Sequence, residues 1–147
     1  MKRPILFRGK SLYNGEWVYG DLVHISGGTI IITSQEEGPV LPDDCDHALE
    51  YRIDEFAPVD HETVGQWTGL IDSSGRHIFE GDIIANGYIY TDLRYEILYN
   101  SDMSSFVMKV PSDVQSNGMP LTELFVQRFG RIVIGNIYDN AELLKTE

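Results

Sequence analysis

The apolar residues of this chain fall into short runs whose length and residue types are typical of β-strands. β-branched and aromatic residues dominate segments 16–23 and 29–33, and the second of these is a continuous apolar run between two threonines. The first pattern favours a strand, and the second favours a strand that is buried on both faces. Further strands are predicted at 64–70, 78–79, 83–84, 88–90, 95–99, 106–110 and 131–138.

Turn-forming residues separate these runs. The Asn-Gly pair at 14–15 is a strong hairpin signal, because both residues tolerate the positive φ of a type I′ turn. Segments 27–28 and 72–75 predict further turns, since glycine and aspartate stabilise turn conformations. Gly65 and Gly69 stand inside a predicted strand and indicate a bulge or a close approach by another backbone segment.

Two carboxylates flank a glycine at 80–82. Glu80 and Asp82 could act as a catalytic acid/base pair, but such a pair needs a cleft and a difference between its two pKa values. The alternative is a tight corner between two strands, in which Gly81 supplies backbone freedom and Asp82 accepts hydrogen bonds from neighbouring N–H groups. We expect the corner.

Helical patterns are short and lie near the C-terminal end. Apolar residues recur at positions i, i+3, i+4 and i+8 in segment 121–129, which predicts one short helix. Asp139-Asn140 supplies an N-cap for a second short helix over 141–144. Because most of the chain is strand with glycine-rich corners, we predict an all-β protein built as a small β-barrel or roll, with minor helices.

Charge changes this picture in two ways. The 147 residues contain 11 Lys+Arg against 23 Asp+Glu, which gives a net charge of −12. This charge disfavours nonspecific binding to DNA or to an anionic membrane, because neutralising phosphates needs clustered basic residues. Segment 36–62 holds ten acidic residues, one basic residue and the interrupting prolines Pro39, Pro42 and Pro58. We expect a loop-rich connector here, which divides the chain into subdomains at 1–60 and 61–147.

Several classes of protein are excluded at this stage. The sequence lacks the roughly 18 consecutive apolar residues that a membrane-spanning helix needs. The basic residues at the start are followed by no long apolar segment, so we expect no signal peptide. A single cysteine, Cys45, excludes an intramolecular disulfide and any multi-cysteine zinc site. These features indicate the cytoplasm.

Cys45 stands two residues before His47, and a cysteine close to a histidine can be a nucleophile with its base. The neighbouring carboxylates of Asp43, Asp44 and Asp46 oppose this function, because they disfavour the thiolate and raise the pKa of the thiol. We expect an acidic loop that happens to contain both residues.

A metal site is the second chemistry considered for this region. Cys45, His47 and His61 could act as ligands together with nearby carboxylates, but the paired spacing that zinc sites show does not occur. His24 and His77 stand on other predicted strand or turn segments and are expected at the surface. We therefore expect no metal site.

Aromatic residues could form a stacking surface for single-stranded nucleic acid. Such surfaces carry basic residues that follow the phosphate backbone, and the nearby cations here are Arg8, Lys10 and Arg94. An aromatic core, partly shared with a groove that binds peptide, explains the pattern better, so no direct nucleic-acid binding is expected. The aromatic residues considered are Trp17, Tyr19, Trp67, Tyr88, Tyr90, Tyr95 and Tyr99.

Three ordered segments together carry a family resemblance. They include Gly15-Glu16-Trp17-Val18-Tyr19-Gly20-Asp21-Leu22, Thr63-Val64-Gly65-Gln66-Trp67-Thr68-Gly69-Leu70 and Val133-Ile134-Gly135-Asn136-Ile137-Tyr138-Asp139-Asn140. In this order and spacing the chain resembles the YopX family, small proteins carried by bacteriophages and by prophages of bacteria. The resemblance implies an all-β fold with an SH3-type roll, which we place in 61–147, beside a second small β subdomain. It implies no established activity, cofactor or catalytic residue.

We therefore expect a non-enzymatic phage or prophage accessory protein that acts through protein–protein contacts in the host bacterial cytoplasm, self-association included. No catalytic, cofactor-binding or metal-binding residue is assigned, and no membrane partner is expected. The alternative is an acidic decoy that mimics the phosphates of DNA and occupies a host nuclease or another DNA-binding protein. The net charge and the carboxylates of 36–62 favour the decoy, whereas the predicted loop lacks the continuous face that such mimics present.

Overall fold

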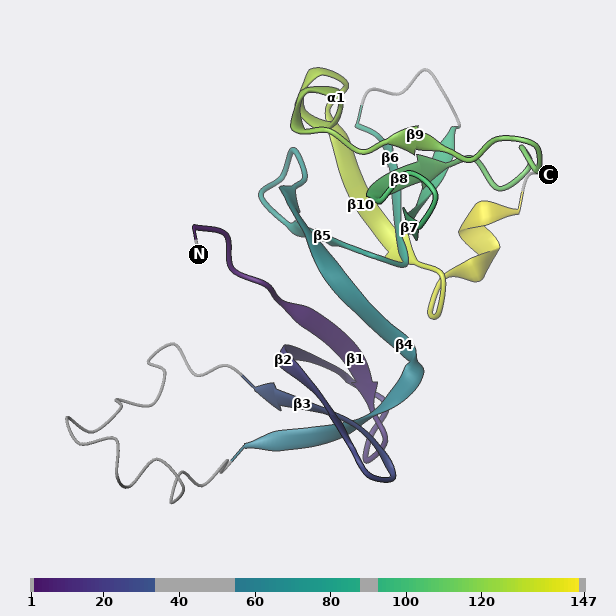
Figure 1. The fold of residues 1–147 in the computed structure, drawn as a ribbon. Coiled ribbons are helices and arrows are strands. Elements are labelled where there is room, and N and C mark those ends of the chain that lie inside the picture. Colours follow the sequence, from purple (N-terminus) through teal and green to yellow (C-terminus); the bar gives the residue numbers. More distant parts are fainter. Residues whose placement is uncertain (1, 34–54, 88–92, 146–147) are drawn as a thin grey trace. The chain divides into compact units, whose positions relative to one another are not determined.

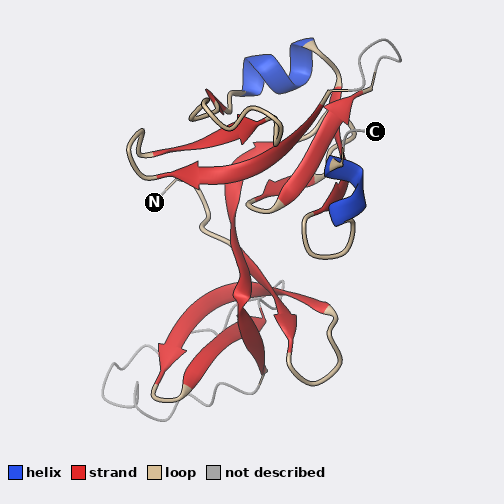
Figure 2. Cartoon of the chain, turned by 90° about the vertical axis from the view of Figure 1, so that its right-hand side faces the viewer, coloured by secondary structure: helices blue, strands red, loops and turns tan. Residues whose placement is uncertain are grey.

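The computed structural model describes residues 2–33, 55–87 and 93–145. The chain divides into two compact units (Figure 1). The N-terminal unit is Ile5–Val64, and the C-terminal unit combines Met1–Pro4 with Gly65–Glu147. The subdomains expected from the sequence were 1–60 and 61–147. Strands dominate both units and the helices are short, which confirms the all-β prediction (Figure 2).

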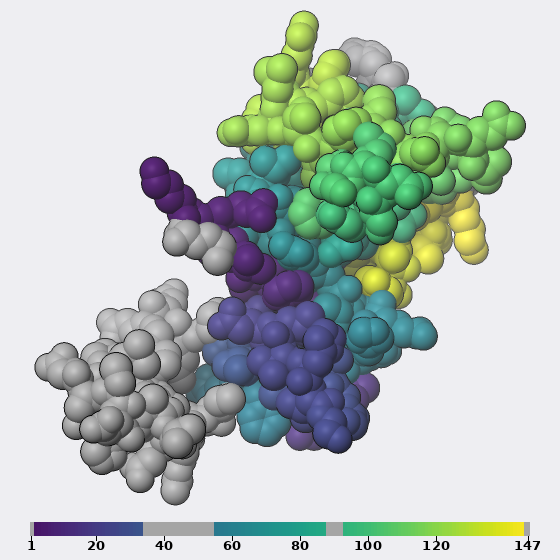
Figure 3. All heavy atoms as spheres, viewed as in Figure 1, coloured from purple at the N-terminus to yellow at the C-terminus, as the bar shows by residue number. Residues whose placement is uncertain are grey.

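The N-terminal unit is a ring of antiparallel strands. Its strands are β1 (Phe7–Ser11), β2 (Trp17–Ile25), β3 (Gly28–Thr33) and the first part of β4 (Phe56–Ile71). They pair in the order β1-β2-β3-β4, and a further pairing of β1 with β4 closes the ring. In Figure 3 the atoms of residues 17–33, which include β2 and β3, form one continuous indigo region. The sheet that closes on itself therefore lies in the N-terminal unit, whereas the sequence placed the roll in 61–147.

The middle of β3 confirms the predicted buried run, since Thr29, Ile30 and Ile31 are all buried. The hairpin predicted at 14–15 connects β1 to β2, but its turn type differs from the prediction. Of the two turn residues, Gly15 alone takes a positive φ, of 71°. The side-chain oxygen of Asn14 instead accepts a hydrogen bond from the Glu16 N–H, which holds a longer turn.

The end of the acidic segment is a strand, which corrects the prediction of a loop there. Pro58 lies inside β4, opposite Ile30 of β3. Its carbonyl accepts a hydrogen bond of 2.9 Å from the Leu12 N–H, so the proline contributes its acceptor although it has no donor. Its neighbours Ala57 and Val59 are buried in the core of the ring. Residues 34–54 of the predicted connector lie outside the described residues.

The C-terminal unit contains a five-stranded antiparallel sheet in the order β10-β6-β7-β8-β9. These strands are β6 (Asp82–Asn86), β7 (Arg94–Asn100), β8 (Ser105–Lys109), β9 (Met119–Pro120) and β10 (Arg131–Asn136). The second part of β4 pairs with β5 (His77–Phe79) in the same unit. The core consists of Ile78, Ile84, Tyr95, Ile97, Met108, Val126 and Val133.

Two short helices cover parts of this unit. The helix predicted at 121–129 is α1 (Glu123–Arg128), and the Thr122 hydroxyl caps its first turn by accepting a 3.2 Å hydrogen bond from the Phe125 N–H. The second predicted helix is the 3₁₀ helix η2 (Ala141–Leu144). Asn140 precedes it but makes no side-chain cap; its side-chain oxygen accepts from the Asn136 N–H instead, which corrects the predicted N-cap.

Gly65 and Gly69 of β4 serve the two purposes predicted for them. A Cβ at Gly65 would lie 2.7 Å from the Glu80 carbonyl oxygen, which is a close backbone approach. Gly69 has a φ of 88°, and the register between β4 and β5 shifts between Trp67 and Ile71. β4 therefore bends at a bulge before it reaches its C-terminal turn.

The turn at 72–75 is attached to β10 by the buried side chain of Asp72. One carboxylate oxygen accepts three hydrogen bonds within the turn, from the Ser74 N–H, the Ser74 hydroxyl and the Arg76 N–H. The other accepts a 2.9 Å hydrogen bond from the Val133 N–H of β10. Burial raises the pKa of Asp72, but these four hydrogen bonds outweigh burial and hold its pKa below the ordinary value.

Candidate functional site

The carboxylates at 80–82 have the contacts of a strand corner. Gly81 takes a φ of 82°. Asp82 is fully buried, and one of its oxygens accepts a 2.8 Å hydrogen bond from the Phe79 N–H. Glu80 accepts a 2.9 Å hydrogen bond from the Gln66 N–H, and burial raises the pKa of its carboxyl. Both side chains thus hold backbone groups where β5 turns into β6.

The three histidines in the described part of the chain lie in different units, with His24 and His61 in the N-terminal unit and His77 in the C-terminal unit. His24 and His61 lie with ring centroids 6.1 Å apart, and the Thr29 hydroxyl is 3.2 Å from one ring and 3.4 Å from the other. His77 stacks on Trp67 with ring centroids 4.4 Å apart. Within residues 2–33, 55–87 and 93–145, no three His, Cys, Asp or Glu side chains group as a metal ion would require. The sequence candidates Cys45 and His47 lie outside these ranges.

The aromatic residues of the described chain belong to both units and make separate contacts within each. In the N-terminal unit, the guanidinium of Arg8 lies 4.5 Å from the Trp17 ring. In the C-terminal unit, Tyr95 is buried beneath the Arg131 guanidinium, and Tyr99 is 46% exposed. Tyr88 and Tyr90 lie outside the described residues. The expected shared aromatic core is therefore divided among separate contacts.

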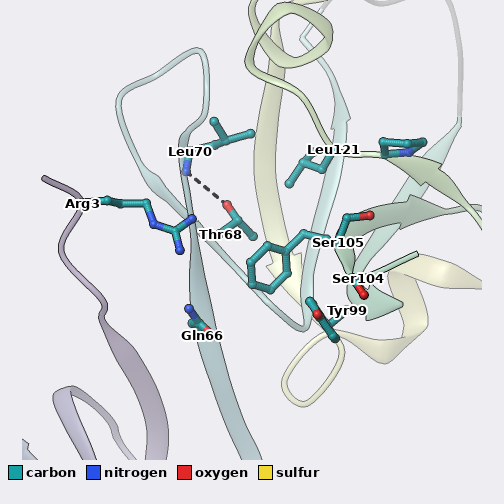
Figure 4. A pocket seen from close by; sticks show the side chains of 10 residues that line it. Arg3, Gln66, Thr68, Leu70, Tyr99, Ser104, Ser105 and Leu121 are labelled. Carbon is teal, nitrogen blue, oxygen red and sulfur yellow. Dashed lines mark hydrogen bonds between the residues drawn. The ribbon is translucent and has the colours of Figure 1, made fainter. Parts of the chain in front are cut away.

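One groove with a volume of about 560 Å³ opens in the C-terminal unit (Figure 4). This volume falls within the roughly 300–1,000 Å³ that is usual for ligand sites. One wall comes from alternating residues of β4, and the other comes from β7, β8, β9 and the residues that follow them. The groove is lined by Arg3, Gln66, Thr68, Leu70, Tyr99, Ser104, Ser105, Phe106, Pro120 and Leu121.

Most polar side chains of the groove are not used by the fold. The side chains of Arg3, Gln66, Tyr99 and Ser105 make no hydrogen bond or ion pair with any residue in the described part of the chain. Thr68 and Ser104 are the exceptions. The Thr68 hydroxyl donates to the Ile78 carbonyl and accepts from the Leu70 N–H, a bond that Figure 4 draws. The Ser104 hydroxyl donates to the Ser101 carbonyl. Four polar groups are thus available to a ligand.

The apolar part of the groove centres on two aromatic rings. Tyr99 and Phe106 pack edge to face, with ring centroids 5.4 Å apart. Pro120 and the two leucines of the groove complete this wall. Exposed aromatic rings beside polar groups are the composition that recurs at protein interfaces.

The backbone around the groove is unusual at two positions. A Cβ at Gly69 would lie 3.3 Å from the Cδ atom of Arg3, so the glycine leaves room for the arginine to lie beside β4. Ser104 has a φ of 49° and is the one non-glycine residue with positive φ in the described chain. Such a conformation costs on the order of 1–3 kcal/mol and tends to occur at functional sites.

Charge distinguishes the groove from the rest of the protein. The C-terminal unit contains 11 acidic and 8 basic residues, and the N-terminal unit contains 12 acidic and 3 basic residues. Among the described residues that line the groove, Arg3 is the sole charged side chain. The one formal charge on the described lining of the groove is therefore positive, on a protein with a net charge of −12.

The sequence did not identify this groove. Of its ten residues, the sequence analysis considers Tyr99 alone as part of a possible binding surface. The alternation of Gln66, Thr68 and Leu70 along one strand could have indicated a shared face. The opposite wall depends on strand pairing between distant segments, for which local sequence gives no signal.

Comparisons relate the chain to known proteins. The sequence profile of the family described as YopX protein matches residues 6–145, which confirms the resemblance found in the three sequence segments. The chain is similar to the crystal structure of protein EF1440 from Enterococcus faecalis, with 27% sequence identity and a TM-score of 0.61. That similarity covers 98% of this chain and 100% of the other chain. No curated protein matches the chain.

The helices give one further observation. Within the described residues, none of them is long and apolar enough to cross a membrane.

Proposed function

The chain belongs to the YopX family, and we propose that it is a non-enzymatic accessory protein of a bacteriophage or prophage that binds a partner protein in the bacterial cytoplasm. The groove of the C-terminal unit is the binding site in this proposal. The association of the family with phages and prophages supports the biological setting, and the similarity to an Enterococcus faecalis protein supports a bacterial one.

The observation that carries the proposal is the set of unused groups in the groove. Tyr99, 46% exposed, packs against Phe106 beside three further polar side chains that have no partner within the described chain. Exposed aromatic area next to free donors and acceptors suits recognition of another protein. The carboxylates at 80–82, in contrast, are occupied by backbone N–H groups, which supports a non-enzymatic function.

The acidic decoy remains as a second candidate. The observation that favours it is the charge of the N-terminal unit, which contains 12 acidic and 3 basic residues. Many of these carboxylates belong to segment 34–54, outside the described residues. A decoy would bind a basic surface through many charges, so its affinity would fall steeply as salt screens them.

Affinity capture from prophage-induced bacterial cells, followed by mass spectrometry, tests the proposal. The bait is used as the natural chain, as Tyr99→Ala and as the matched control Tyr13→Ala. Tyr13 is 78% exposed and belongs to the other unit. We expect a protein that binds the natural chain and the control, and that binds Tyr99→Ala at least about tenfold more weakly, as for an aromatic anchor.

Salt and DNA separate the two candidate functions. The partner of a groove should remain bound in about 0.5 M salt, because apolar contacts are weakly screened. It should also tolerate replacement of Asp43, Asp44, Asp46, Asp54 and Glu55 by Asn or Gln. A partner that is released by either treatment, that is displaced by DNA and whose binding is unchanged by Tyr99→Ala would refute the groove as the binding site. It would support the decoy.

A further inference from the structure

The chemistry of the groove restricts the partner segment that it can accept, and this inference rests on the proposed function. Arg3 presents a guanidinium that makes no hydrogen bond or ion pair with the described residues. A guanidinium carries five N–H donors in a planar fork, which matches the two oxygens of a carboxylate. Arg3 is exposed, so its guanidinium is accessible to an anion from outside the unit.

The protein itself does not supply that anion within the described chain. The C-terminal unit holds 11 acidic residues, yet none of the described residues that line the groove is acidic. Nucleic-acid phosphates are a poor match, because a phosphate backbone requires several cations and the groove has one. A carboxylate on a peptide needs one guanidinium and is the anion that fits.

The length of the groove indicates how much peptide it can hold. Gln66, Thr68 and Leu70 line it from alternating positions of β4. Two residues of a regular strand span about 6.6 Å, and the bulge at Gly69 shortens the step from Thr68 to Leu70. The three positions therefore cover less than about 13 Å, which is the length of about three or four extended residues. The free amide of Gln66 and the hydroxyl of Ser105 lie on opposite walls and could bind the backbone of such a segment (Figure 4).

The aromatic wall adds a second requirement. Tyr99, Phe106 and Pro120 form apolar surface on the side of the groove opposite β4. Burying an apolar side chain there gains about 25 cal/mol for each Å² removed from water, whereas a polar side chain would gain little. An apolar residue is thus favoured near the carboxylate.

We infer that the groove binds an extended internal peptide segment of about three or four residues, with an Asp or Glu carboxylate against Arg3 and an apolar side chain against Tyr99 and Phe106. A free C-terminus presents the same two carboxylate oxygens to the guanidinium, so the experiment includes it as the alternative that would overturn the internal segment.

The test selects short random peptides on the purified full chain from two display libraries, one with internal peptides and one with free C-termini. Selected peptides are synthesised with a fluorescent label, and their dissociation constants are measured by anisotropy. We expect enrichment of an apolar residue next to Asp or Glu in the first library. Enrichment in the second library alone, next to the terminal carboxylate, would overturn the internal segment in favour of a free C-terminus. Replacing that Asp or Glu by its amide, or amidating the terminus, should weaken binding about tenfold, as should Arg3→Gln.

Arg76→Gln is the matched control for charge, since Arg76 is exposed in the same unit and does not line the groove. It should bind the selected peptides as the natural chain does. Peptides that lose affinity with Tyr99→Ala but bind Arg3→Gln normally would overturn the carboxylate inference while supporting the groove. Peptides that are insensitive to both variants, or a selection that enriches none, would overturn the inference, and the first of these results would also oppose the proposed function.

Discussion

Replacing Asp72 by Asn tests the attachment of the β4–β5 turn to β10. The substitution keeps the size of the side chain and one of its two oxygens. That oxygen can still accept from the Ser74 and Arg76 donors of the turn, because these hydrogen bonds converge on a single atom. The new amide group must then face the Val133 N–H, whose present acceptor is 2.9 Å away. Two donors would meet in a buried site.

The magnitude follows from these contacts. Leaving the buried Val133 N–H without an acceptor costs about 1–3 kcal/mol, and the three turn hydrogen bonds weaken when their acceptor loses its charge. Removing a buried charge offsets part of this loss. We expect Asp72→Asn to lower the free energy of unfolding by about 2–4 kcal/mol, which moves the urea midpoint by roughly 1–2 M.

The assay is urea unfolding at several pH values, with Asp113→Asn as the control. Asp113 is exposed and accepts a single backbone hydrogen bond in its own turn, so its loss should change stability by less than about 1 kcal/mol. The pKa of Asp72 is lower in the folded state than its ordinary value of 3.8. Its stabilising effect is therefore complete above that value and is lost as the pH falls through the lower folded pKa. Equal midpoints at neutral pH, or a difference that grows on acidification, would refute this account of the turn.

Four further predictions concern single positions. Gly81→Val should destabilise by roughly 1–3 kcal/mol because Gly81 has a φ of 82°, and an unchanged melting temperature would contradict the corner. Gly65→Ala should destabilise by about 1–3 kcal/mol in urea unfolding, because its Cβ would meet the Glu80 carbonyl oxygen at 2.7 Å. The side chain of Arg131 packs on three aromatic rings, while its Nε and Nη1 atoms have no hydrogen-bond partner among the described residues. Arg131→Met keeps the packing, so its free energy of unfolding should stay within about 1 kcal/mol of the natural chain. Arg131→Ala removes the packing and should lower the free energy of unfolding by about 2–4 kcal/mol. Cys45→Ser should leave folding and partner binding intact, and stoichiometric zinc that is lost with this substitution would contradict the prediction.

Local rules predicted the parts of the fold that depend on a few neighbouring residues. The Asn-Gly hairpin, the 72–75 turn and the glycine corner at Gly81 follow from the conformations that those residues favour. The bulge at Gly69 was predictable for the same reason, because a glycine inside a strand commonly marks a bulge or a close backbone approach. In each case the deciding interaction spans only a few positions of sequence.

The errors arose where a distant segment decided the outcome. Pro58 was expected in a loop, but its strand pairs with β1 and β3, and its carbonyl accepts a hydrogen bond from the Leu12 N–H. Asn140 was expected to cap η2, but its side-chain oxygen accepts a hydrogen bond from the Asn136 N–H instead. The groove joins Arg3 to residues about a hundred positions later in the chain. Neither ring closure nor this convergence leaves a periodic signal in the sequence.

The division of the chain into units has a consequence for its synthesis on the ribosome. The N-terminal unit is one continuous segment, Ile5–Val64, so its ring can close soon after Val64 leaves the exit tunnel. The five-stranded sheet must wait for β10, because β6 lies between β10 and β7 in that sheet.

At roughly 5–20 residues per second, translation needs about 3–14 s to proceed from Val64 to Val133. During this interval β6 has been made while its partner β10 has not, and Asp72 has no Val133 N–H to bind. A nascent chain that pauses before β10 would therefore carry a finished N-terminal ring and an unpaired strand edge, which is the state most exposed to chaperones and to aggregation.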